Sequence, residues 1–144
     1  MYYGTRVGDE LFAPSTYSPM AADRAVQIVI IDDDREHLQY LLECLGGAGY
    51  AAAGYEDAAT AVAEIGRSGA DLVITDIFMP YMDGFEVLRH LQDTAPSIPV
   101  IAVDWAHDRS FLEIIKRMGA VEAVGSPVDR EELLAAVKRT LGSV

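Results

Sequence analysis

The clearest pattern in the chain is a series of short apolar runs, most of them rich in β-branched residues, separated by amphipathic stretches. The runs cover residues 27–31, 51–55, 72–75, 100–103 and 120–124. Continuous apolar runs of this length are typical of strands that are buried on both faces. The amphipathic stretches cover residues 38–45, 58–66, 85–91, 109–118 and 130–141. Their apolar residues recur with helical spacing, so each stretch predicts a helix.

Strand and helix therefore alternate five times along the chain, with short connections between them. This alternation predicts an α/β fold in which a parallel sheet carries helices on both faces. A length of 144 residues indicates one domain. We expect that domain to cover residues 26–142. Residues 1–25 have no clear period and are broken by Gly and Pro, which predicts an irregular N-terminal arm.

Composition narrows the classes of function. The net charge of −12 argues against a nucleic-acid-binding surface and fits a protein that binds cations or a basic partner. The chain has no apolar run of membrane-spanning length and no signal-peptide pattern, which predicts a cytoplasmic protein without membrane association. The only cysteine, Cys44, is expected to be buried, and His37, His90 and His107 are expected to face solvent.

Acidic residues follow three of the predicted strands. Asp32 and Asp33 follow the first strand, Asp76 the third and Asp104 the fourth, at the edge where open α/β sheets place their ligands. Two alternatives are simpler: carboxylates at a helix entrance for the first pair, and turn formers or solvent-facing residues for the others. If the carboxylates converge, their repulsion must be relieved by a proton or a cation. Oxygen ligands without His or Cys favour Mg²⁺, and a carboxylate beside Mg²⁺ can attack phosphorus.

At this point the chain resembles the receiver domain of two-component response regulators, across roughly residues 26–142. The matching motifs are Ile30-Ile31-Asp32-Asp33-Asp34, Asp76-Ile-Phe-Met-Pro80-Tyr-Met-Asp83-Gly84, Ile98-Pro99-Val100-Ile101, Gly119-Ala120 and Pro127. The second motif, with its acidic residue at the end of a buried strand, is the most specific of these.

The resemblance implies a flavodoxin-like (βα)₅ fold with strand order 2-1-3-4-5. It implies that Asp76 is the phosphoacceptor, phosphorylated by a sensor histidine kinase, a phosphotransfer protein or a small acyl phosphate. It also implies that Mg²⁺ is held by Asp33, Asp76 and the backbone carbonyl of Phe78, while Asp32 acts through water. The peptide bond before Pro127 is expected to be cis.

Three positions depart from the family pattern. Asp104 stands where a Thr or Ser would bind the phosphoryl group, and bulky Trp105 follows it. Ser126 stands where a lysine would contact the phosphoryl oxygens, and Ala123 replaces the aromatic residue that moves on activation. Asp104 either strengthens divalent-ion binding or turns outward. Trp105 either shields Asp76 or contacts a partner.

The sequence therefore predicts a single-domain response regulator that is not an enzyme, a monomer or a weak homodimer. It would signal by protein contact through the face of the fourth helix, fifth strand and fifth helix. Expected members or neighbours of that face are Phe111, Ile115, Lys116, Glu122 and Arg130. The main alternative is a phosphorylation-independent interaction module. A third, an aspartyl-phosphate hydrolase, is supported only by the Asp32-x-Asp34 pattern.

Overall fold

The computed structural model describes residues 2–4, 26–106 and 109–142 of the chain. Its strands are β1 (Tyr2–Gly4), β2 (Gln27–Ile31), β3 (Ala51–Tyr55), β4 (Leu72–Asp76), β5 (Val100–Asp104) and β6 (Glu122–Gly125). Its helices are α1 (Arg35–Gly47), α2 (Ala58–Ser68), α3 (Gly84–Thr94), α4 (Ser110–Arg117) and α5 (Arg130–Leu141). The five predicted strands and five predicted helices are therefore all present, with ends that differ by a few residues.

The strands form one sheet in the order β1-β3-β2-β4-β5-β6. All pairings from β3 to β6 are parallel, which confirms the flavodoxin-like fold and the predicted order of the five main strands. The sequence did not predict β1, which pairs antiparallel with the outer edge of β3 and comes from the segment expected to be irregular. The rest of that predicted arm lies outside the described residues.

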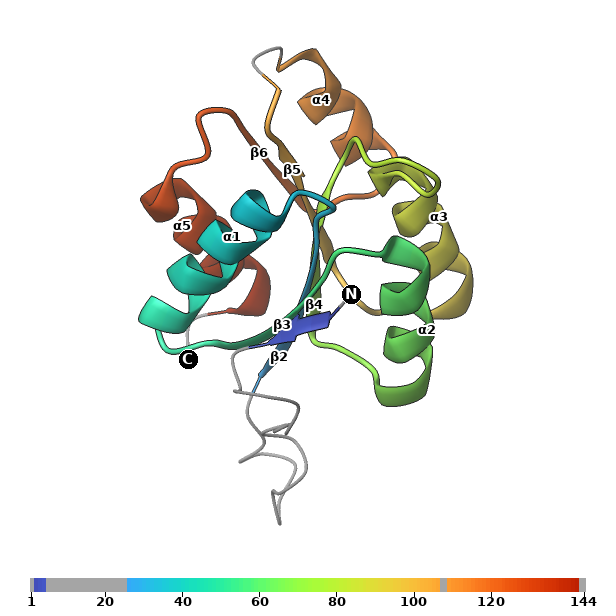
Figure 1. Ribbon diagram of the computed structural model, residues 1–144. Coiled ribbons are helices and arrows are strands. Elements are labelled where there is room, and N and C mark those ends of the chain that lie inside the picture. The colour runs from blue at the N-terminus through green and yellow to red at the C-terminus, as the bar shows by residue number, and fades with distance from the viewer. Residues whose placement is uncertain (1, 5–25, 107–108, 143–144) are drawn as a thin grey trace.

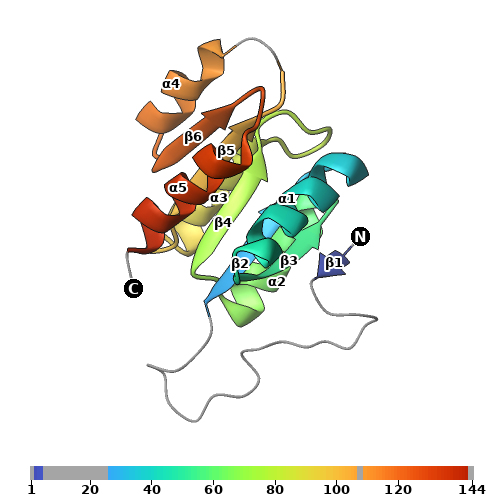
Figure 2. The same ribbon diagram turned by 90° about the vertical axis from the view of Figure 1, so that its left-hand side faces the viewer.

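Helices cover both faces of the sheet, as Figure 1 and Figure 2 show. On one face α1 and α5 pack over a core that includes Leu41, Ile74 and Leu133. On the other face α2, α3 and α4 pack over a second core that includes Val62 and Ile115. Strand β4 is buried along its whole length, as the continuous apolar run in its sequence predicted. No helix within the described ranges combines the length and the apolar character that crossing a membrane requires.

The start of α3 lies against the backbone of β4. Asp83 caps this helix through a reciprocal capping box with Glu86, and the Gly84 amide donates to the Ile77 carbonyl at 2.7 Å. A Cβ atom at Gly84 would lie 2.6 Å from the Asp76 carbonyl oxygen. Gly84 is therefore required by close approach of the two backbones, and this approach fixes the loop that follows Asp76.

Candidate functional site

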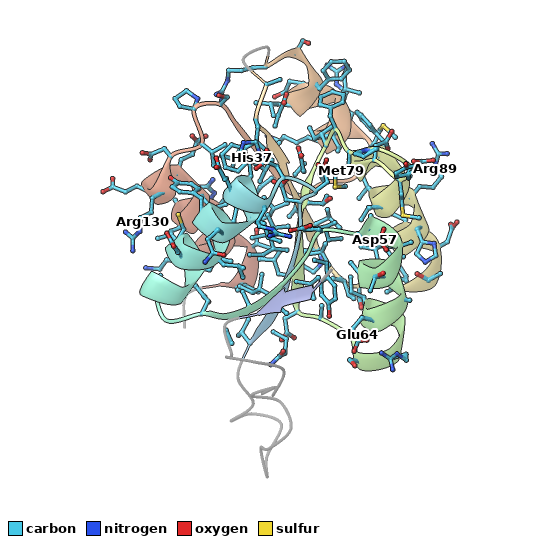
Figure 3. All side chains as sticks on the ribbon, viewed as in Figure 1. His37, Asp57, Glu64, Met79, Arg89 and Arg130 are labelled. Atoms are coloured by element: carbon cyan, nitrogen blue, oxygen red, sulfur yellow. The ribbon has the colours of Figure 1, made fainter. Side chains whose placement is uncertain are left out.

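The carboxyl ends of β2 and β4 bring three aspartates together. Asp32, Asp33 and Asp76 each offer a carboxylate oxygen, and these oxygens lie within 4.8 Å of one another. Asp32 is fully buried, Asp76 is 6% exposed and Asp33 is exposed, so the group opens to solvent on the side of Asp33. Figure 3 shows His37 of α1 and Met79 of the β4–α3 loop at similar height in the upper half of the view. The donor set is all oxygen, which suits a hard cation such as Mg²⁺.

The electrostatics of this group favour an added positive charge. Burial raises the pKa of Asp76, and the neighbouring charges of Asp32 and Asp33 raise it further. Backbone hydrogen bonds from Phe78 and Ile77 lower the pKa of Asp76 but do not offset the increase. Burial also raises the pKa of Asp32. A divalent cation between these oxygens would replace repulsion with attraction and keep both carboxyl groups ionised.

Asp32 is held by two hydrogen bonds from different parts of the chain. Its Oδ1 accepts from the Asp34 amide at 2.9 Å, and its Oδ2 accepts from Nε1 of Trp105 at 2.8 Å. The first bond is local and turns the chain into α1, because Asp34 is itself the N-cap of that helix. The second bond comes from the residue after β5, so it connects the ends of two strands across the site.

Trp105 is the centre of an aromatic stack beside the acidic group. Its ring lies parallel to that of His37, with centroids 3.9 Å apart, and Tyr40 meets it edge to face at 6.0 Å. The Tyr40 hydroxyl in turn donates to the Val128 carbonyl. His37 is half-buried in this stack and faces solvent only in part, with its side chain 35% exposed. His90 is exposed as predicted, and His107 lies outside the described residues. A contact between the first turn of α1 and the residue after β5 leaves no mark in the periodicity, which is why the sequence did not reveal it.

Asp104 and Ser126 occupy neighbouring strand ends, but neither belongs to the group of three carboxylates. Asp104 is fully buried, so the alternative in which it turns outward to solvent is wrong. Its Oδ1 accepts from the Ala106 amide at 2.9 Å, and its Oδ2 finds no hydrogen-bond donor among the described residues. Ser126 is half-buried, and the peptide bond between it and Pro127 is cis, as the resemblance implied.

Two further side chains border the site. Phe78, whose backbone carbonyl is an expected Mg²⁺ ligand, has a side chain 46% exposed that meets Phe111 edge to face at 4.9 Å. Arg109, from the connection between β5 and α4, donates from Nη1 to the Ser126 carbonyl at 3.1 Å. The sequence did not identify Arg109, because nothing in the pattern shows where a loop arginine directs its guanidinium.

Comparison with known proteins identifies the family of the chain. The family model for the response regulator receiver domain matches residues 28–138, which is most of the chain. The response regulator protein TodT of Pseudomonas putida is 31% identical over 120 residues, which are 83% of this chain and 53% of TodT. The DNA-binding transcriptional regulator NtrC of Escherichia coli is 30% identical over 115 residues, 79% of this chain and 24% of NtrC. The chain thus spans about half the length of TodT and about a quarter of the length of NtrC.

Solved structures give the same fold. A CheY-like response regulator receiver domain protein from Methanospirillum hungatei superposes with a TM-score of 0.74 at 26% identity, over 81% of this chain and 94% of that one. A response regulator from Chloroflexus aurantiacus superposes with a TM-score of 0.76 at 24% identity, over 82% and 98% of the two chains. Because the Chloroflexus protein is only 24% identical to this chain, its likeness concerns the fold alone.

Proposed function

The chain belongs to the response regulator receiver domain family of two-component systems, and from this premise we propose that Asp76 accepts a phosphoryl group in the presence of Mg²⁺. The observation that carries the proposal is the convergence of Asp32, Asp33 and Asp76 at one strand edge. We assign this activity to a receiver domain at residues 26–142.

Each residue of the site has a distinct part in the proposed reaction. A carboxylate oxygen of Asp76 attacks phosphorus, and the bond from phosphorus to the donor's nitrogen or oxygen breaks with its electron pair leaving on the donor. Asp33, Asp76 and the Phe78 carbonyl would hold Mg²⁺, and buried Asp32 would act on it through water. Bound Mg²⁺ would offset negative charge on the phosphoryl oxygens. The raised pKa of Asp76 supports this assignment, because such a carboxyl group gains most from a nearby cation.

Receiver domains exchange signals with histidine kinases or phosphotransfer proteins, and we propose the same class of phosphodonor here. We propose that the chain acts as a signalling module rather than an enzyme. Its output would pass through the face formed by α4, β6 and α5, where Ile114, Met118 and Val121 are exposed hydrophobic residues. Ile115, expected on that face, is fully buried in the core and cannot contact a partner.

A second candidate function is a phosphorylation-independent interaction module. The observation that favours it is the fully buried carboxylate of Asp104, next to the strand that carries Asp76. A charge there opposes an incoming phosphoryl group, and Ser126 supplies no compensating cation. The intact acidic group favours phosphorylation, whereas the altered neighbours favour the interaction module, so the two functions require a direct chemical test.

The test is intact-mass spectrometry after incubation with acetyl phosphate and Mg²⁺, with Asp76→Asn as the control. We expect one added phosphoryl group in the natural chain and none in the variant. Asp33→Ala, which removes an exposed ligand, should abolish both Mg²⁺ binding and the adduct. A chain that gains no adduct, and that also fails to bind beryllofluoride with Mg²⁺, would refute the phosphorylation of Asp76 and favour the interaction module.

A further inference from the structure

A phosphoryl group on Asp76 would bring about −1.5 to −2 charges into a site that already contains several carboxylates. One divalent cation does not balance this sum, so a protein cation is needed at the strand ends. Among the described arginines and lysines, Arg35 lies at the start of α1, but its Nε is already paired with Glu56 at 2.9 Å. Arg109 contacts the carboxyl end of β6 through the Ser126 carbonyl, whereas Arg139 is paired with Glu122 at the other end of that strand.

The guanidinium of Arg109 lies in a space that the chain leaves open for it. A Cβ atom at Gly125, the last residue of β6, would lie 2.7 Å from Nη1 and 2.9 Å from Cζ of Arg109. The guanidinium therefore occupies the place of the side chain that Gly125 lacks. Among the described residues, its Nη1 donates to a neutral acceptor, the Ser126 carbonyl, and no carboxylate forms an ion pair with it.

The sheet register places Gly125, beside this guanidinium, two strands from Asp76 along the carboxyl edge of the sheet. Gly125 is the register partner of Asp104 on β5, and Asp76 is the register partner of Val103 on the other side of that strand. Two strand spacings therefore separate Gly125 from Asp76, about 10 Å across the sheet. The long, exposed side chain of Arg109 and the phosphoryl group would each cover part of that distance.

We propose that Arg109 supplies the cation that binds the phosphoryl group on Asp76, in the role that Ser126 cannot fill. When the group arrives, the guanidinium leaves the Ser126 carbonyl and donates to the phosphoryl oxygens, for which its planar donors are well suited. Arg109 is also the N-cap residue of α4 and makes no side-chain capping bond there. Because Arg109 is the residue from which α4 begins, a movement of its backbone with the side chain would couple the site to the proposed output face. This inference rests on the proposed phosphorylation of Asp76.

The test is the affinity for beryllofluoride at saturating Mg²⁺, followed by the fluorescence of Trp105, the only tryptophan of the chain. Loss of the charge-assisted hydrogen bonds in Arg109→Gln should weaken beryllofluoride binding by about tenfold to about 150-fold. Arg117→Gln, which removes the same charge from the other end of α4, should leave it within about twofold. The affinity for Mg²⁺ alone should not change in either variant, because Arg109 is assigned to the phosphoryl group and not to the metal.

Rescue separates a direct contact from a structural role. Adding Ser126→Lys to Arg109→Gln should restore beryllofluoride binding, whereas Ser126→Lys alone should add little, because the site needs one such cation. Equal losses in Arg109→Gln and Arg117→Gln, or no loss in either, would overturn the role of Arg109 while leaving the phosphorylation of Asp76 intact. If the natural chain gains the acetyl phosphate adduct but binds no beryllofluoride, this inference is wrong and the proposed function stands. If it shows neither, both are wrong.

Discussion

Replacing Asp76 by Asn should stabilise the protein at alkaline pH and have little effect at acidic pH. In the folded chain Asp76 is nearly buried beside Asp32, and its pKa is raised by that burial and by the neighbouring charges. A carboxyl group with a raised folded-state pKa contributes its full stability only below its unfolded pKa of 3.8. That contribution is then lost as the pH rises through the folded-state value. Asn does not titrate, so it avoids this loss.

The size of the effect follows from the shift. The pKa of Asp76 rises from 3.8 to about 8. Since one pKa unit corresponds to about 1.4 kcal/mol, this span amounts to about 6 kcal/mol between the charged and neutral forms. Relaxation of the site and entry of water reduce the effective cost of a buried charge. We therefore expect Asp76→Asn to raise the free energy of unfolding by at least about 2 kcal/mol near pH 8.

The assay is urea unfolding of both chains in EDTA at about pH 4, 6 and 8, with the difference in unfolding free energy plotted against pH. Asp93→Asn, an exposed position on α3, is the control and should give a difference near zero throughout. Adding Mg²⁺ should stabilise the natural chain more than the variant and so narrow the gap at pH 8. A gap of the same size at every pH would refute the reasoning, because it would show that the Asp76 charge is not opposed in the fold.

Two other substitutions test contacts around the site. Trp105→Phe keeps an aromatic ring but removes the hydrogen bond to Asp32. It should lower the free energy of unfolding at neutral pH by about 1.5–3 kcal/mol in urea titrations. An unchanged urea midpoint would show that this bond does not stabilise the fold. Gly84→Ala places a Cβ 2.6 Å from the Asp76 carbonyl, so the start of α3 must move. We expect lower thermal stability and a weaker acetyl phosphate adduct, and a variant equal to the natural chain in both would show that the loop has room.

The sheet and its acidic edge could be predicted because both depend on short-range patterns. Strand β4 is buried on both faces, and its run of apolar residues records that burial directly. Parallel strands have their carboxyl ends at one edge, and the strand order that the resemblance implied makes β2 and β4 neighbours, so Asp32 and Asp76 lie close together. The site was therefore predictable from the strand pattern together with the strand order of the family.

The surroundings of the site could not be predicted, because they depend on where individual side chains point. Asp104 was expected either to bind a cation or to face solvent, and it is instead buried against the Ala106 amide. Ile115 was expected to belong to the output face or to border it, and its side chain is buried in the core beneath α4. Strand β1 was missed because three residues paired with a sheet edge do not establish a period.

The connection between β5 and α4 supplies both donors that distinguish this site. Trp105 gives a hydrogen bond to Asp32, and Arg109 places a cation at the end of β6. These donors act on different partners: the indole on a carboxylate that is present before phosphorylation, and the guanidinium on the group that arrives with it. Their substitutions should therefore separate. Trp105→Phe should change the stability and the Mg²⁺ affinity of the unphosphorylated chain, with no phosphoryl analogue present. Arg109→Gln should change only the binding of beryllofluoride. If both variants altered Mg²⁺ affinity alike, the connection would act as one structural unit, and the assignment of separate roles would be wrong.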